Sequence, residues 1–157
     1  TDVKRIIPNL RPSVLDELGI VATINWLCQE FNSVHGDIEI VKRIEIGDHQ
    51  VPDELKTPIF RLLQEALHNI AKHSGARHID VSLVRTGGRI CLEVCDDGAG
   101  FNPGLMGENH ENLSGYGLTG MKERAEISGA EFQIDSRPGR GTRIMAAWPI
   151  ESIQAIN

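Results

Sequence analysis

The chain has 157 residues, enough for one domain with a hydrophobic core of its own. With 40% hydrophobic and 24% charged residues, its composition is typical of a soluble globular protein and excludes a disordered one. A net charge of −6 argues against a general nucleic-acid binder, so we expect no nucleic-acid partner. Three cysteines without a disulfide pattern, and no apolar run long enough to span a membrane, favour a cytoplasmic domain.

The first part of the chain predicts a helix, a strand and a second helix. Residues 9–36 show an approximate helical stripe, and the Ile- and Val-rich run 38–46 is typical of a strand. A second amphipathic helix is expected from Pro52 to Gly75, because proline suits a helix start and glycine a helix end. The stripe expected to be buried on the first helix consists of Leu15, Leu18, Ala22, Ile24, Trp26 and Leu27.

The remainder predicts a sheet with one further helix. Alternating apolar residues in 78–85 and 89–96 indicate two strands joined by a turn at Gly87 and Gly88. A polar, glycine-rich stretch follows at 102–116, then a helix ending at Gly129 and two strands around "RPGRG". Within it, residues 102–114 would suit a lid or an ordinary surface loop. This order predicts an α+β fold, a two-layer α/β sandwich in which about three helices cover one face of a mixed sheet.

The second helix carries a polar face whose side chains could bind a metal ion and phosphate. Glu65, Asn69 and Lys72 fall within about 60° of one another at 100° per residue. An ordinary solvated face would have the same spacing. However, an Asn carbonyl and a carboxylate also suit Mg²⁺, and a lysine suits phosphate oxygens.

The stretch "VCDDGAGF" places two aspartates directly after a strand. Asp96 has the parity of the buried residues of that strand, so its carboxylate is expected on the helix-covered side. A buried carboxylate needs a hydrogen-bond donor, and the amino group of a purine is one. Gly98 and Gly100 would allow a sharp turn and a close ligand. A simple Asx turn remains an alternative, and Asp97, of opposite parity, receives no ligand role.

Two further segments favour a phosphate or base contact. Gly115 and Gly117 precede a helix, where free backbone N–H groups can face an anion, although helix-entry glycines are often only caps. In "GRGT", Thr142 shares the inward parity of its strand, so its hydroxyl could reach a ligand or could merely begin the strand.

In order and spacing, "QEALHNIAKH", "DDGAGF", "GYGLTGMKERA" and "GRGT" resemble the N box, G1 box, G2 box and terminal Gly-Thr of the GHKL ATPases. The form is most similar to the catalytic domain of sensor histidine kinases of the nitrate-sensor and DesK-like class. The resemblance covers residues 9–150. It implies a histidine-kinase-like ATPase domain over 13–150, preceded by a linker or the end of a dimerisation helix in 1–12 and followed by a tail in 151–157.

The resemblance also implies roles for individual residues. Asn69 would ligate Mg²⁺ bridging the phosphates of ATP, and Glu65 would position water or metal. Lys72 and His73 would meet phosphates, and Asp96 would accept a hydrogen bond from the adenine amino group. The residues implied to shape or border the nucleotide pocket are Gly98, Gly100, Gly115, Gly117, Leu118 and Thr142.

The activity implied is transfer of the γ-phosphoryl group of Mg·ATP to a histidine on a dimerisation domain outside this chain. None of the six histidines of the chain stands in the usual setting of a phosphoacceptor. The implied partners are that dimerisation domain and a response regulator, within a homodimer whose membrane anchoring the sequence leaves open. Two alternatives stay open: a non-catalytic nucleotide-binding module, and another GHKL enzyme such as an ATPase clamp or an anti-sigma serine kinase.

Overall fold

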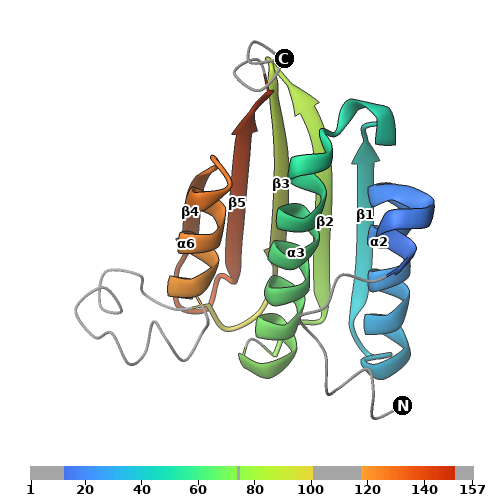
Figure 1. The fold of residues 1–157 in the computed structure, drawn as a ribbon. Helices are drawn as coiled ribbons and strands as arrows, with labels where there is room; N and C mark the ends of the chain where they lie inside the picture. The colour runs from blue at the N-terminus through green and yellow to red at the C-terminus, as the bar shows by residue number, and fades with distance from the viewer. Residues whose placement is uncertain (1–12, 74, 101–117, 151–157) are drawn as a thin grey trace.

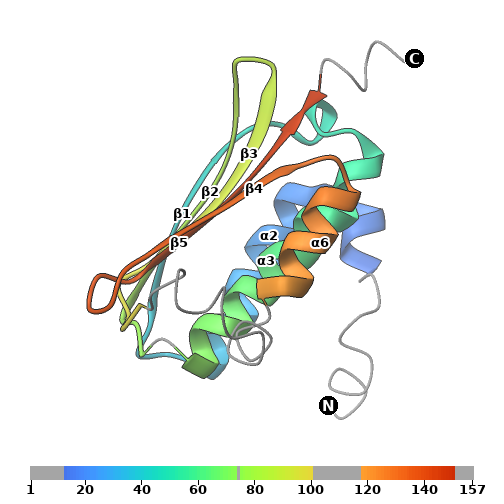
Figure 2. The ribbon, with the colours of Figure 1, turned by 90° about the vertical axis from the view of Figure 1, so that its left-hand side faces the viewer.

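The computed structural model describes residues 13–73, 75–100 and 118–150, and there three helices cover one face of a five-stranded sheet (Figures 1 and 2). The elements in chain order are helix α2 (Ser13–Val34), strand β1 (Glu39–Glu45), the short 3-10 helix η1 (Asp48–Gln50), helix α3 (Asp53–His73), strands β2 (His78–Thr86) and β3 (Arg89–Asp96), helix α6 (Leu118–Ile127), and strands β4 (Glu131–Ser136) and β5 (Thr142–Pro149). The predicted α+β sandwich is therefore confirmed. The terminal segments 1–12 and 151–157 and the lid expected at 102–114 lie outside the described residues.

The sheet has the strand order β1-β2-β3-β5-β4, in which only the β1–β2 pair is parallel. Parallel neighbours need a crossover connection, and α3 supplies it by running back along the sheet. The β2–β3 connection is the predicted tight turn. Gly87 and Gly88 both have positive φ angles, 56° and 75°, as a two-residue type I′ hairpin requires.

The hydrophobic core lies between the sheet and the helices. The inward-facing residues of β2 and β3 are buried as their alternation predicted: Ile79, Val81, Leu83, Ile90, Leu92 and Val94. The apolar stripe of α3 packs into the same core, with buried residues that include Ile59, Leu63, Ala66 and Ile70. Each such side chain contributes roughly 1.5–3 kcal/mol of burial free energy, so this stripe fixes how α3 sits on the sheet.

Helix α2 departs from the expected continuous stripe because it is broken at Gly19. This residue has φ 90° and ψ −179°, outside the helical region. Its break rotates the second part of the helix relative to the first, so Leu18 is 63% exposed and Ile20 is fully buried. The stripe predicted through Leu18 was wrong there, since it assumed one uninterrupted helical period.

Within the described part of the chain, no helix is both long enough and apolar enough to cross a bilayer. The three cysteines, Cys28, Cys91 and Cys95, are free, as their spacing indicated.

Candidate functional site

A row of polar residues crosses the sheet at the end where β3 finishes. Asp96 is the last residue of β3 and pairs with Thr142, the first residue of β5, which in turn pairs with Ser136 at the end of β4. On its other side Asp96 pairs with the buried Ile79 of β2. Since partners in register share a face, Asp96, Thr142 and Ser136 lie on the helix-covered side, as the parity of Asp96 and Thr142 predicted.

Asp96 is half-buried, and burial raises the pKa of its carboxyl group. The backbone N–H of Gly98 donates to Oδ1 at 2.8 Å, and this bond lowers the pKa again, as does the N–H of Thr142. The negative charge of Asp97 acts in the raising direction. A desolvated carboxylate with few donors around it gains from any further donor, which makes this position suitable for recognising an amino group.

The Thr142 hydroxyl is part of a small hydroxyl pair. Its Oγ1 lies 2.8 Å from Oγ of Ser136, and the Ser136 hydroxyl also donates to the carbonyl of Gly141 at 3.0 Å. Sequence reasoning did not single out Ser136. Its parity relative to the "GRGT" turn could have indicated it only if the register of β4 against β5 had been known.

Two glycines let the loop after β3 pack closely on the β4–β5 turn. Gly100 has φ 68°, and a Cβ there would collide with the carbonyl oxygen of Arg137. Gly141 has φ 76°, and a Cβ there would collide with the carbonyl oxygen of Asp96. Glycine is therefore required at position 100 because the backbone of Arg137 packs against it, which the sequence did not reveal. The importance of Gly141, beside Thr142, was also missed.

The polar face of α3 carries Glu65, Asn69 and Lys72. Glu65 and Asn69 are of intermediate exposure and Lys72 is exposed. Among the described residues, none of these three side chains forms a hydrogen bond or ion pair. The C-terminal end of α3 lies at the same end of the molecule as the end of β3 and the start of α6 (Figures 1 and 2). The described elements that carry Asp96 and the end of the α3 polar face therefore reach the same end of the molecule.

The remaining predicted residues are Leu118, Gly115, Gly117 and His73. Leu118, the first residue of α6, is 1% exposed and belongs to the hydrophobic core, so its observed contacts are with protein. Gly115 and Gly117 lie outside the described residues. His73 ends α3, but its side chain is not among those described.

The donor set on α3 suits a hard cation held largely by other ligands. An amide oxygen and a carboxylate from one helix face give at most two protein ligands, which is how Mg²⁺ is often held beside phosphates. No cluster of three or more His, Cys, Asp or Glu side chains that could hold a metal occurs within 13–73, 75–100 and 118–150. A metal held by protein side chains alone is thus not indicated in those ranges.

Comparison with known proteins assigns most of the chain to one family. Residues 54–152 match the family model described as histidine kinase-, DNA gyrase B- and HSP90-like ATPase. The chain is 32% identical over 149 residues to the signal transduction histidine-protein kinase/phosphatase DegS of Brevibacillus brevis, covering 95% of this chain and 37% of that protein. It is also 32% identical over 154 residues to an uncharacterized sensor-like histidine kinase of Chloroflexus aurantiacus, covering 96% and 26%.

Solved structures share the fold. The blue-light activated histidine kinase of Erythrobacter litoralis EL346 superposes with a TM-score of 0.71 at 20% identity, over 87% of this chain and 43% of that one. The mycobacterial sensor histidine kinase MprB gives a TM-score of 0.60 at 23% identity, over 82% and 93%. The chain thus spans 26–37% of the length of these two curated relatives, and it covers 93% of the solved MprB chain.

Proposed function

The chain belongs to the histidine kinase-, DNA gyrase B- and HSP90-like ATPase family, and on this basis we propose that it is the catalytic domain of a sensor histidine kinase. In this proposal it binds Mg·ATP and transfers the γ-phosphoryl group to a histidine on a dimerisation domain outside these 157 residues. The observation that carries the proposal is the half-buried Asp96 at the end of β3, which lies at the same end of the molecule as the C-terminal end of α3. The polar face of α3 has no partner among the described residues.

Base recognition is assigned to Asp96. Its carboxylate accepts a hydrogen bond from the exocyclic amino group of adenine, which replaces the water that burial removes. Thr142 supports this contact from the neighbouring strand, and Gly98 holds the carboxylate from the loop side. Gly100 contributes by letting that loop pack onto the β4–β5 turn.

Phosphate and metal binding are assigned to α3. Asn69 offers its amide oxygen and Glu65 its carboxylate to Mg²⁺, which when bound neutralises charge on the phosphates. Lys72, and His73 beside it, meet phosphate oxygens. Gly115 and Gly117 border the phosphates, and Leu118, whose side chain is buried in the core, contributes only its backbone. Phosphoryl transfer depends on positioning and charge neutralisation, so these residues need supply no covalent chemistry.

The nucleophile is a histidine of the dimerisation domain, in the same or the partner subunit of a homodimer. A response-regulator aspartate accepts the phosphoryl group next. The nitrate-sensor and DesK-like subclass, suggested by the Lys72–His73 ending of the motif, belongs to this proposal, as does any membrane anchor of the full-length protein.

The test mixes this chain with the separately produced dimerisation domain of its parent protein and γ-labelled ATP. We expect label on that domain, stable to alkali and lost in acid, as phosphohistidine is. ATP binding without labelled protein would instead favour a non-catalytic nucleotide module. An acid-stable label would favour a serine kinase.

Replacement of Asn69 by alanine tests the metal role in a separate binding assay. Asn69→Ala should abolish Mg²⁺-dependent ATP binding measured by calorimetry. Gln64→Ala is the matched control, because Gln64 is an amide of similar exposure on another side of α3. Binding by Asn69→Ala equal to that of the unaltered chain would exclude the metal role.

A further inference from the structure

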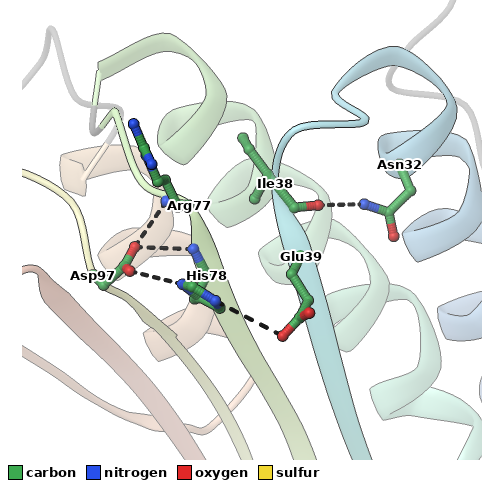
Figure 3. A network of polar contacts seen from close by, with 6 residues as sticks. All are labelled: Asn32, Ile38, Glu39, Arg77, His78 and Asp97. Atoms are coloured by element: carbon green, nitrogen blue, oxygen red, sulfur yellow. Dashed lines mark hydrogen bonds and ion pairs between the residues drawn. The ribbon is translucent and has the colours of Figure 1, made fainter.

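Asp97, the second aspartate after β3, has a carboxylate engaged by the neighbouring strand (Figure 3). Its Oδ1 accepts the backbone N–H groups of Arg77 at 2.8 Å and His78 at 2.9 Å. Its Oδ2 lies 3.0 Å from Nδ1 of His78. The Asp97 backbone N–H also donates to the His78 carbonyl at 3.3 Å. These contacts tie the residue after β3 to the residues that begin β2.

This clamp lies immediately beyond the last regular rung of the β2–β3 ladder. That rung pairs Asp96 with Ile79. Asp96 is therefore held between the ladder on one side and the Asp97 clamp on the other. Asp96 has the inward parity of β3, whereas the carboxylate of Asp97 is held at the end of the strand by the backbone N–H groups of Arg77 and His78.

The ion pair between His78 and Asp97 contributes little energy to the clamp, but the geometry of the clamp is well defined. The side chains of His78 and Asp97 are 61% and 50% exposed, and ion pairs of that exposure contribute only about 0–1 kcal/mol. Recognition of a base, by contrast, needs its acceptor held to within about 0.5 Å. A contact that adds little stability can therefore still decide where the Asp96 carboxylate sits.

The charge of the clamp is permanent near neutral pH. The backbone N–H groups of His78 and Arg77, together with the His78 ring, lower the pKa of Asp97 to about 2. Glu39 of β1 is a further charged group near the His78 ring, with its Oε1 3.8 Å from Nε2.

We propose that Asp97 is a positioning residue for base specificity, which fixes the Asp96 carboxylate where it distinguishes a purine with an exocyclic amino group from one with a carbonyl. The inference rests on the proposed function, since it requires that Asp96 reads the base. It extends that function to a residue that makes no contact with the nucleotide.

The experiment compares the affinities of this chain for Mg·ATP and for Mg·inosine triphosphate by calorimetry. The two nucleotides differ at the exocyclic group, so the ratio of their affinities reports on the Asp96 contact. A merely structural loss would lower both affinities alike. The variants are Asp97→Ala, Asp97→Asn, which keeps an oxygen for the two N–H groups, and Asp80→Ala, a control that removes an exposed carboxylate from β2.

We expect Asp97→Ala to weaken ATP binding about tenfold with little change for inosine triphosphate, while Asp97→Asn and Asp80→Ala keep the original ratio. An unchanged ratio in Asp97→Ala would overturn the inference. If Asp97→Ala loses its native circular dichroism, Asp97→Ser, whose single hydroxyl cannot reach both N–H groups, takes its place under the same criterion. If the unaltered chain itself binds both nucleotides equally, or binds neither, the proposed function fails instead.

Discussion

Asp96 combines a cost to folding with a benefit to binding. Burial raises the pKa of its carboxyl group, so at neutral pH the folded protein holds a charge in a place that disfavours it. Residues of this kind are expected where a ligand, and not the fold, needs them.

Asp96→Asn should therefore weaken ATP binding at least tenfold while changing the free energy of unfolding by less than about 1 kcal/mol. The amide oxygen can keep the Gly98 N–H bond, but the amide NH₂ presents a donor to the adenine amino group. Calorimetry and urea unfolding measure the two effects. Asp80→Asn serves as the exposed control, and unchanged ATP affinity in Asp96→Asn would remove the residue from the base site.

Gly141 and Gly139 form a natural pair for measuring how tightly the β4–β5 turn packs. Both have positive φ, 76° and 78°, but a Cβ at Gly139 would meet nothing within 4 Å, whereas one at Gly141 would collide with Asp96. Alanine at Gly139 should cost about 1–2 kcal/mol from φ alone, and alanine at Gly141 clearly more. Equal losses in urea unfolding would show that the Gly141 contact is unimportant.

Among the helices, α2 is organised around its break at Gly19. The Asp48 side chain from η1 accepts the N–H of Val21 at 3.0 Å, which caps the second part of the helix from outside it. Such a carboxylate accepts a hydrogen bond from a free N–H group, and its negative charge interacts favourably with the positive end of the helix dipole.

Asp48→Ala should consequently destabilise the protein by about 0.5–2 kcal/mol. Asp48→Asn, which retains an acceptor oxygen, should cost less. Thermal or urea unfolding of both variants measures the difference, and a loss of the same size in each would mean that the charge, and not the hydrogen bond, is what matters.

How much the sequence could reveal depended on whether a feature is local. Strand alternation identified the buried residues of β2 and β3 and the inward side of Asp96, because parity needs no knowledge of neighbours. The helical period, by contrast, failed at Leu18, because the break at Gly19 interrupts the helix. The contacts of Asp97 with Arg77, and of Gly141 with Asp96, join residues distant in the chain, so no local pattern could predict them.

For the whole protein, Asp96 and Asp97 are expected to change the free energy of unfolding in opposite directions as the pH is lowered. Asp97 has its pKa lowered from 3.8 to about 2, so its stabilising contribution is fully present above pH 4 and is lost as the pH falls toward 2. Asp96 has a raised pKa, so protonation on acidification relieves its burial cost.

The difference in unfolding free energy between the unaltered chain and Asp97→Ala should accordingly shrink as the pH is lowered from 5 toward 2. Urea unfolding at a series of pH values measures it, and Asp80→Ala should show no such convergence. A difference that stays constant across this range would mean that the Asp97 charge is not what the clamp contributes.

The β2–β3 hairpin lies at the opposite end of the sheet from the end of β3 (Figures 1 and 2). Gly87 is exposed, and a side chain there would meet nothing within 4 Å. Exposed loop tips tolerate insertions, whereas cutting the chain within α3 would separate β1 from its parallel partner. A fluorescent reporter inserted at Gly87 would therefore lie at the far end of the sheet and leave the proposed nucleotide site at the end of β3 accessible.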